Sequence, residues 1–131
     1  MAYCLTFTCP KCGFSVDSWD EGNPYILDLK NVRRYFYHPG ERKVIEKVTN
    51  AINGRECTED EREKILTERC GSSPDHICRK CGKITKLDPT KDVLVCSKCK
   101  SDQLEATYGL SGKKCIKCDG VFTKGENTMI S

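Results

Sequence analysis

Histidine is scarce in this sequence, and its scarcity limits the catalytic chemistry that the chain can carry. Among 131 residues there are 2 histidines, His38 and His76. Neither belongs to a Ser-His-Asp arrangement or to a His-Glu metal motif, which are the patterns typical of hydrolases and metalloenzymes. We therefore do not expect an enzyme, and the sequence indicates no small-molecule substrate.

Apolar residues are also few, at 37% of the chain with a mean hydropathy of −0.56. The core built from them must be small, so cross-links or bound metal are needed to stabilise it. No apolar run approaches the roughly 20 residues of a membrane helix. Residues 1–10 lack the basic leader and the unbroken apolar run of a secretory signal. We expect a protein of a reducing interior, with no membrane partner, in the cytoplasm or, in a eukaryote, the nucleus.

Cysteine, in contrast, is abundant. Of 11 cysteines, eight form four Cys-x-x-Cys pairs: Cys9/Cys12, Cys78/Cys81, Cys96/Cys99 and Cys115/Cys118. The odd total, the regular spacing and the lack of a secretory signal argue against a disulfide framework. Each pair places two thiolates on one tight turn, and two such turns complete a tetrahedron around Zn²⁺. The sequence thus predicts two Cys4 sites that hold two zinc ions.

The residue after each pair indicates which turns share a metal. The intervals of 14 residues from Cys81 to Cys96 and 15 from Cys99 to Cys115 both suit a zinc ribbon. Two turns are followed by glycine and two are not, and zinc ribbons often combine one turn of each kind. The favoured arrangement is site 1 of Cys9, Cys12, Cys115 and Cys118, and site 2 of Cys78, Cys81, Cys96 and Cys99. A crossed arrangement, Cys9/Cys12 with Cys96/Cys99 and Cys78/Cys81 with Cys115/Cys118, stays open.

The central stretch CRKCGKITKLDPTKDVLVCSKCKSDQLE, within Ile77 to Glu105, resembles a zinc ribbon of the rubredoxin-like group. Its layout is similar to that of ribbons in nickel-insertion accessory proteins and in transcription and ribosomal proteins. It departs from the commonest form at Ser97, where proline is usual, and at Lys100, where glycine is usual. The resemblance implies a structural zinc in a closed shell of four thiolates, with no open position for water or substrate.

The predicted fold class is a small, metal-stabilised α+β fold. It combines two zinc-ribbon or knuckle sites, short antiparallel β-hairpins and an inserted helical hairpin. Apolar residues at helical spacing predict a helix from Glu41 to Ile52 that ends at Asn53-Gly54. A second helix begins at Thr58, whose hydroxyl can form a capping box with Glu61, and ends at Gly71.

Strands are expected where apolar and polar residues alternate. They cover residues 14–19, a hairpin of 25–29 and 32–37, and segments 83–87, 93–95, 103–108 and 121–123, with residues 72–75 as a linker. The predicted units are residues 1–40 with 109–131 around site 1, residues 41–71 as the helical hairpin, and residues 72–108 as the central ribbon.

The net charge of the chain determines which functional hypothesis we favour. The formal net charge is +3, but eight ligand thiolates and two Zn²⁺ would bring it to about −1. A strong polyanion binder usually keeps a clear positive excess. The leading hypothesis is therefore a non-catalytic zinc-binding module that acts through another macromolecule, with a protein favoured as partner. The alternative is a nucleic-acid-binding zinc ribbon, with candidate contacts at Lys83, Lys98, Lys100, Lys113 and Lys114.

A third hypothesis is a thiol redox protein or an iron electron carrier. Redox Cys-x-x-Cys motifs normally follow a strand and open a helix, and none of the four pairs is expected to do so. Cys4, Cys57 and Cys70 lie outside the pairs and are predicted to be small buried apolar residues.

Overall fold

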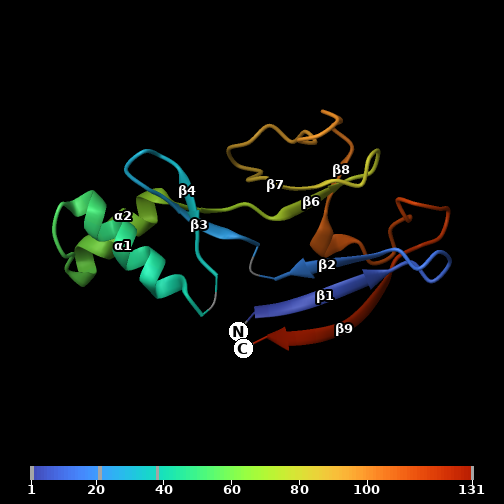
Figure 1. Cartoon of the computed structure of the whole chain (residues 1–131), viewed down its shortest axis with the longest axis horizontal. Helices are drawn as coiled ribbons and strands as arrows, with labels where there is room; N and C mark the ends of the chain where they lie inside the picture. Colours follow the sequence, from blue (N-terminus) through green and yellow to red (C-terminus); the bar gives the residue numbers. More distant parts are fainter. Residues whose placement is uncertain (1, 21, 38, 131) are drawn as a thin grey trace. The chain divides into compact units, whose positions relative to one another are not determined.

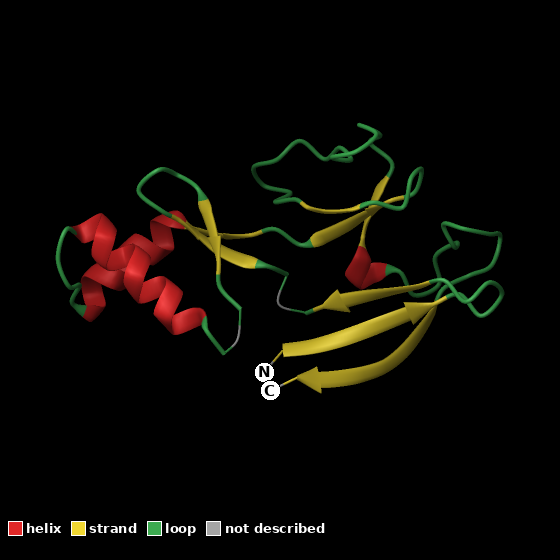
Figure 2. Cartoon of the chain, viewed as in Figure 1, coloured by secondary structure: helices red, strands yellow, loops and turns green. Residues whose placement is uncertain are grey.

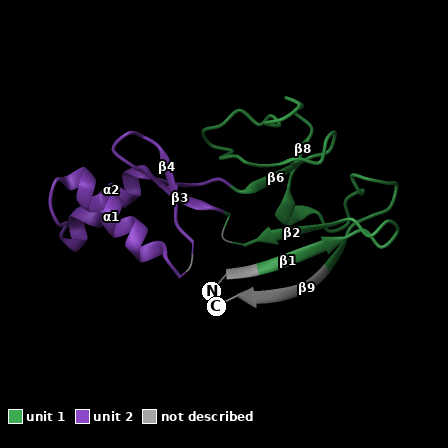
Figure 3. Cartoon of the chain, in the orientation of Figure 1, with its two compact units in different colours: residues 1–22, 74–131 green, residues 23–73 purple. Residues whose placement is uncertain are grey.

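The computed structural model describes residues 2–20, 22–37 and 39–130, and the side chains of residues 4–20, 22–37 and 39–124. The chain divides into two compact units (Figure 3). The first unit contains residues 1–22 and 74–131, and the second contains residues 23–73. Over the described ranges, two α-helices and three antiparallel three-stranded sheets make up the regular structure (Figures 1 and 2). The coarse prediction of a small α+β fold is confirmed.

The first sheet of the first unit has the order β2-β1-β9. Its strands are β1 (Ala2–Thr8), β2 (Ser15–Trp19) and β9 (Thr123–Ile130). β1 lies in the middle, with Phe7 opposite Val16 of β2 and Lys124 of β9. The N-terminal and C-terminal strands are therefore neighbours, as Figure 1 shows. The loop that joins β1 to β2 contains the first Cys-x-x-Cys pair.

The second sheet of this unit has the order β7-β6-β8. Its strands are β6 (Asp75–Cys78), β7 (Ile84–Lys86) and β8 (Leu104–Ala106), and the 3₁₀ turn η1 (Thr107–Gly109) follows. Ile77 lies in the central strand, opposite Ile84 and Glu105, and is fully buried. The β6–β7 connection carries Cys78 and Cys81, so this sheet positions the second group of cysteines.

The core of the first unit joins residues from distant parts of the chain. Its buried members are Leu5, Phe7, Cys9, Val16, Ile77, Leu110, Cys115 and Phe122. A buried hydrogen bond of 2.7 Å between the hydroxyls of Ser18 and Thr107 ties β2 to η1. Two of the eight core residues are cysteines of the Cys-x-x-Cys pairs, so this core includes part of the candidate metal centre.

The second unit combines a sheet with the helical hairpin. The sheet has the order β4-β3-β5 and consists of β3 (Pro24–Leu27), β4 (Arg33–Tyr35) and β5 (Cys70–Ser72). Tyr25 is fully buried in β3 and faces Gly71 of β5. A Cβ atom at position 71 would overlap the ring and hydroxyl of Tyr25. Glycine is thus required there for β5 to approach β3.

The two helices begin and end where the local signals predict, except at one end. α1 (Glu41–Asn53) is closed by Gly54, whose φ of 77° is left-handed. α2 (Glu59–Arg69) is opened by the Thr58 capping box: Thr58 Oγ1 accepts from the N–H of Glu61 at 3.2 Å, and the Glu61 carboxylate accepts from the N–H of Thr58 at 3.0 Å. α2 ends at Arg69 rather than Gly71, because residues 70–72 are drawn into sheet pairing with β3.

Several strand predictions need correction. Residues 93–95 form no strand, because the N–H of Val95 donates to the carbonyl of Val93 at 3.0 Å in a local turn. Val93 is 78% exposed. The predicted linker at residues 72–75 contains the end of β5 and the start of β6. Of residues 103–108 only Leu104–Ala106 is a strand. The strand expected at 121–123 is displaced: Val121 forms an isolated bridge with Lys114, and β9 begins at Thr123. β1 was not predicted. The hairpin at 24–35 pairs with β5 and belongs to the second unit, whereas the sequence grouped it with the first knuckle.

Candidate metal centres

The eight paired cysteines form two tetrads, both within the first unit. Tetrad 1 consists of Cys9, Cys12, Cys115 and Cys118, and tetrad 2 of Cys78, Cys81, Cys96 and Cys99. Within each tetrad all four Sγ atoms lie within 4.8 Å of one another. The structure therefore brings the sulfurs together in the favoured arrangement and not in the crossed one, which the residue after each pair also allowed.

The distances between sulfurs from different turns fit a metal-centred tetrahedron. They are 3.5 Å for Cys9–Cys118 and 3.7 Å for Cys12–Cys115 in tetrad 1. In tetrad 2 they are 3.6 Å for Cys78–Cys99 and 3.5 Å for Cys81–Cys96. A Zn–S bond of about 2.3 Å gives a tetrahedral S–S edge of about 3.8 Å, whereas a disulfide bond is about 2.05 Å. Both tetrads could hold a metal ion.

One backbone hydrogen bond recurs in all four turns. The N–H of the first cysteine donates to the carbonyl five residues later: Cys9 to Phe14, Cys78 to Lys83, Cys96 to Ser101 and Cys115 to Gly120, at 2.8–2.9 Å. In three turns the residue after the second cysteine is left-handed, with φ of 82° at Gly13, 80° at Gly82 and 64° at Lys100. Lys100 thus adopts the conformation that glycine takes in the other two turns.

The fourth turn uses its glycine differently. Gly120 lies beside tetrad 1, where a Cβ atom would stand 2.6 Å from Cys9 Sγ and 3.3 Å from Cys118 Sγ. Its N–H also donates to Cys118 Sγ at 3.3 Å. Our sequence reasoning missed Gly120, although the sequence Cys118-Asp119-Gly120 offered the signal of a glycine next to a cysteine pair.

Backbone N–H groups also point at the first sulfur in three of the four turns. The N–H of Cys81 donates to Cys78 Sγ and that of Lys98 to Cys96 Sγ, both at 3.4 Å, and that of Lys117 donates to Cys115 Sγ at 3.3 Å. Such donors favour the thiolate over the thiol. The turns are therefore prepared to present negatively charged sulfur.

The sulfurs of a tetrad perturb one another's pKa values. Hydrogen bonds from the N–H groups of Cys99 and Lys98 outweigh burial and lower the pKa of Cys96 to about 6. Burial raises the pKa of Cys9, but hydrogen bonds from the N–H of Cys12 and from Cys118 prevail and lower it to about 7.

The opposite shift occurs at Cys81 and Cys118. The N–H of Lys83 lowers the pKa of Cys81, but burial and the neighbouring sulfurs together raise it to about 11. At Cys118 the N–H of Gly120 lowers the pKa, and burial and the other three sulfurs raise it to about 12. Four sulfurs this close cannot all ionise without a compensating cation. The donor set suits a soft or borderline metal such as Zn²⁺.

Two contacts brace the tetrads from outside. Lys11 beside the first turn forms an ion pair with Asp119 of the fourth turn, and both side chains are largely exposed. Arg79 forms an ion pair with Glu105 at 3.0 Å and donates to the carbonyl of Lys114 at 2.5 Å. Arg79 follows Cys78 and Lys114 precedes Cys115, so this side chain links the surroundings of the two tetrads.

The remaining candidate residues lie outside the tetrads. The lysines proposed for nucleic-acid contact, Lys83, Lys98, Lys100, Lys113 and Lys114, are all exposed. Cys4 and Cys57 are buried as expected, but Cys70 is exposed because it caps α2 and starts an outer strand. His76 is buried, with Nδ1 2.8 Å from the carbonyl of Pro74, and belongs to neither tetrad. His38 lies outside the described residues.

No protein-family model, curated protein or solved structure matches this chain. Neither described helix is both long and apolar enough to cross a membrane.

Proposed function

We propose that this chain is a non-catalytic zinc-binding module that holds two structural Zn²⁺ ions and acts by binding another protein. The pair of Cys4 tetrads, with sulfurs 3.5–3.7 Å apart across the turns, carries this proposal. Four thiolates complete the tetrahedral shell of Zn²⁺ and leave no position for water or substrate. The segment Ile77 to Glu105 would then be a zinc ribbon of the rubredoxin-like group.

In this function the metal stabilises the fold. Bound Zn²⁺ would neutralise the repulsion among the thiolates and contribute folding free energy on the order of 10 kcal/mol per site. Cys9 and Cys115 belong to the hydrophobic core of the first unit. Zinc binding and burial of that core would therefore occur together, and the zinc-loaded chain would present a rigid surface to its partner.

A protein partner is favoured over nucleic acid by charge. The zinc-loaded chain carries about −1 in total, and the five exposed candidate lysines are spread over several separate loops of the first unit. Nucleic-acid binding would have to be driven by phosphate contacts, and its affinity would fall steeply with salt. That salt dependence separates the two kinds of partner.

Native mass spectrometry of the untagged protein from its own cells tests the proposal. We expect two zinc ions and a second polypeptide on the zinc-loaded chain. Iron in place of zinc would favour the electron-transfer alternative. A decrease in mass caused by disulfide formation between paired thiols, if a reductant reverses it, would favour the redox alternative. Detection of the zinc-loaded chain without a second polypeptide, at several salt concentrations, would contradict protein binding. Bound oligonucleotide would favour the nucleic-acid alternative.

A further inference from the structure

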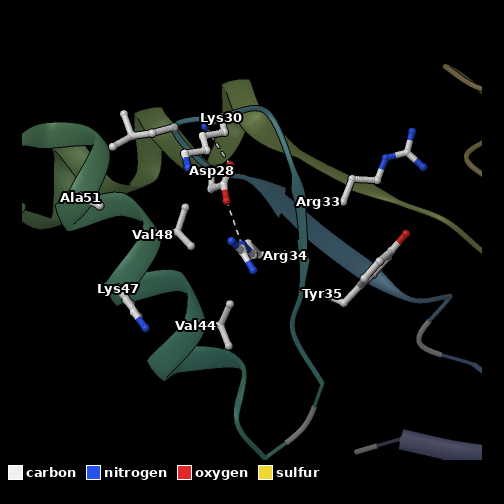
Figure 4. Close-up of a pocket in the computed structure, with 10 residues that line it drawn as sticks. Asp28, Lys30, Arg33, Arg34, Tyr35, Val44, Lys47, Val48 and Ala51 are labelled. Carbon is white, nitrogen blue, oxygen red and sulfur yellow. Dashed lines mark hydrogen bonds and ion pairs between the residues drawn. The ribbon is translucent and has the colours of Figure 1, made fainter.

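The second unit, which contains neither tetrad, has a groove of its own. It is formed by the β3–β4 hairpin and α1, and has a volume of about 620 Å³ (Figure 4). This volume falls within the range of about 300–1,000 Å³ that is typical of ligand sites. Because all of its lining residues come from residues 28–51, the groove belongs to the second unit alone.

The floor of the groove is an apolar stripe on α1. Val44, Val48 and Ala51 recur at i, i+4 and i+7, so they share one face of the helix. At 1.5 Å per residue the stripe is about 10 Å long. Figure 4 shows the side chains of Val44 and Val48 pointing toward Arg34 of the hairpin. Val48 is buried, Val44 is half-buried and Ala51 is exposed. Leu29 at the edge is 61% exposed, so the stripe is open at its Ala51 end and beside Leu29.

The rim of the groove is cationic on both sides. Lys47 comes from α1, whereas Lys30 and Arg34 come from the hairpin. Lys30 and Lys47 are exposed, and neither ammonium group forms an ion pair within the part of the chain that the structure describes. The cations therefore lie on two different elements, one on each side of the apolar stripe.

The single acidic residue among those lining the groove is already engaged in the hairpin. The Asp28 carboxylate accepts hydrogen bonds from the N–H of Lys30 at 2.9 Å and of Val32 at 3.0 Å. It also forms an ion pair with Arg34 Nε at 2.8 Å. Asp28 thus orders the hairpin tip and the Arg34 side chain, and it leaves the lysines on either side available to an incoming anion.

We propose that this groove binds an acidic amphipathic helix of the partner protein. Apolar side chains of that helix would contact Leu29, Val44 and Ala51. Its flanking carboxylates would pair with Lys47 on one side and with Lys30 and Arg34 on the other. The inference rests on the proposed function, namely that the chain acts by binding a protein.

The arrangement favours a helix over a phosphate ligand. A phosphate group is usually held by donors that converge on one point, whereas these cations flank a stripe two helical turns long. An amphipathic helix that enters a groove presents apolar anchors at i, i+3 or i+4, and i+7, which is the spacing of the stripe itself. A nucleic acid would satisfy the cations but would leave the apolar floor unfilled.

The test uses the full chain loaded with zinc and a fluorescent peptide of about 18 residues, or five helical turns. The peptide has leucine on one helical face and glutamate on both flanks. Fluorescence anisotropy should show binding with a Kd of about 10 μM, and a matched peptide with lysine in place of glutamate should bind at least about tenfold more weakly. An oligothymidylate of similar charge serves as the polyanion control.

Matched variants locate the site. Lys47→Glu should weaken peptide binding about tenfold, whereas Lys43→Glu, an exposed lysine one turn earlier on the same helix and outside the groove, should change it less than about twofold. Ala51→Trp fills the groove without a change in charge and should abolish binding. Thr67→Trp, at an exposed position of α2, should not. Circular dichroism and zinc content confirm that each variant is folded.

The outcomes separate this inference from the proposed function. Equal losses from Lys43→Glu and Lys47→Glu, or peptide binding that Ala51→Trp leaves intact, would overturn the groove as a helix site. If the partner from cells copurifies equally with wild type and Ala51→Trp, the groove proposal fails and the proposed function stands. If no polypeptide copurifies with wild type, the proposed function fails, and the groove proposal fails with it.

Discussion

The substitution Gly120→Ala should weaken one metal centre and leave the other intact. The added Cβ would lie 2.6 Å from Cys9 Sγ, 3.0 Å from Lys11 Cβ and 3.3 Å from Cys118 Sγ. Two of these three atoms are Sγ atoms of tetrad 1. Ordinary van der Waals contact begins near 3.4 Å, so Cys9 Sγ would have to move by about 0.8 Å.

Such a displacement is large for a metal ligand. Ligand distances in a competent site stay within about 0.2 Å of their ideal values. Extra volume in a close-packed site costs about 1–3 kcal/mol, which corresponds to about a 5- to 150-fold loss of affinity at tetrad 1. Tetrad 2 is built from other turns and should keep its metal.

Chelator competition monitored by native mass spectrometry measures the two affinities separately. If both tetrads hold Zn²⁺ as proposed, the wild type should release its two ions over one range of chelator concentration, and Gly120→Ala should release the first ion at about 5- to 150-fold lower concentration. Gly109→Ala is the matched control, because a Cβ at that position meets no atom within 4 Å. Unchanged release from Gly120→Ala, or equal effects of the two substitutions, would refute the close approach of Gly120 to the sulfurs.

Three further predictions follow from the same geometry. Replacing Cys115 and Cys118 by serine disrupts tetrad 1 and should remove hydrogen-exchange protection from residues 2–20, while β6 and the second unit stay protected. Loss of protection at β6 alone would contradict the assignment of these cysteines to tetrad 1. Lys100→Gly should raise the free energy of unfolding by about 0.5–1 kcal/mol in urea titration because it relieves a left-handed φ of 64°, while Lys98→Gly should lower it. The pKa of Glu61 is lowered from 4.5 to about 2, chiefly by the N–H of Thr58 and then by Arg55. The Glu61 carboxylate therefore contributes its full stabilisation of the folded state above pH 4.5, and this stabilisation is lost as the pH falls toward 2. Exchange in α2 should then differ between wild type and Glu61→Gln at pH 6 and converge near pH 2, and a constant difference would count against the lowered pKa of Glu61.

The helices were predictable because their signals are local. Gly54 ends α1 and Thr58 with Glu61 begins α2, and each signal acts within one turn of the chain. The grouping of the cysteines was predictable only in part, since the residue after each pair also allowed the crossed arrangement. Lys100 shows the limit of that signal, because its φ of 64° is the glycine conformation without glycine.

The strands were less predictable because their partners are distant. β1 owes its central place to β9, which joins residues 2–8 to residues 123–130. In β6 only Ile77 is an ordinary apolar residue, and the buried His76 beside it conceals the pattern of a central strand. In the sequence Gly71 indicates the end of a helix. In the structure it allows β5 to approach the ring of Tyr25, which lies far away in the chain. No local signal reports such contacts.

The two units solve the shortage of apolar residues in different ways. In the first unit, Cys9 and Cys115 are at once core residues and members of tetrad 1, so the core and the metal centre share atoms. The second unit contains neither tetrad and depends on Tyr25, the helix caps and its own ends. Those ends are held together because Asn23 and Ser73 exchange hydrogen bonds of 3.1 and 2.9 Å. The chain thus leaves and rejoins the first unit at adjacent residues. An insertion closed in this way can carry its own binding groove without altering the ligand geometry of either tetrad.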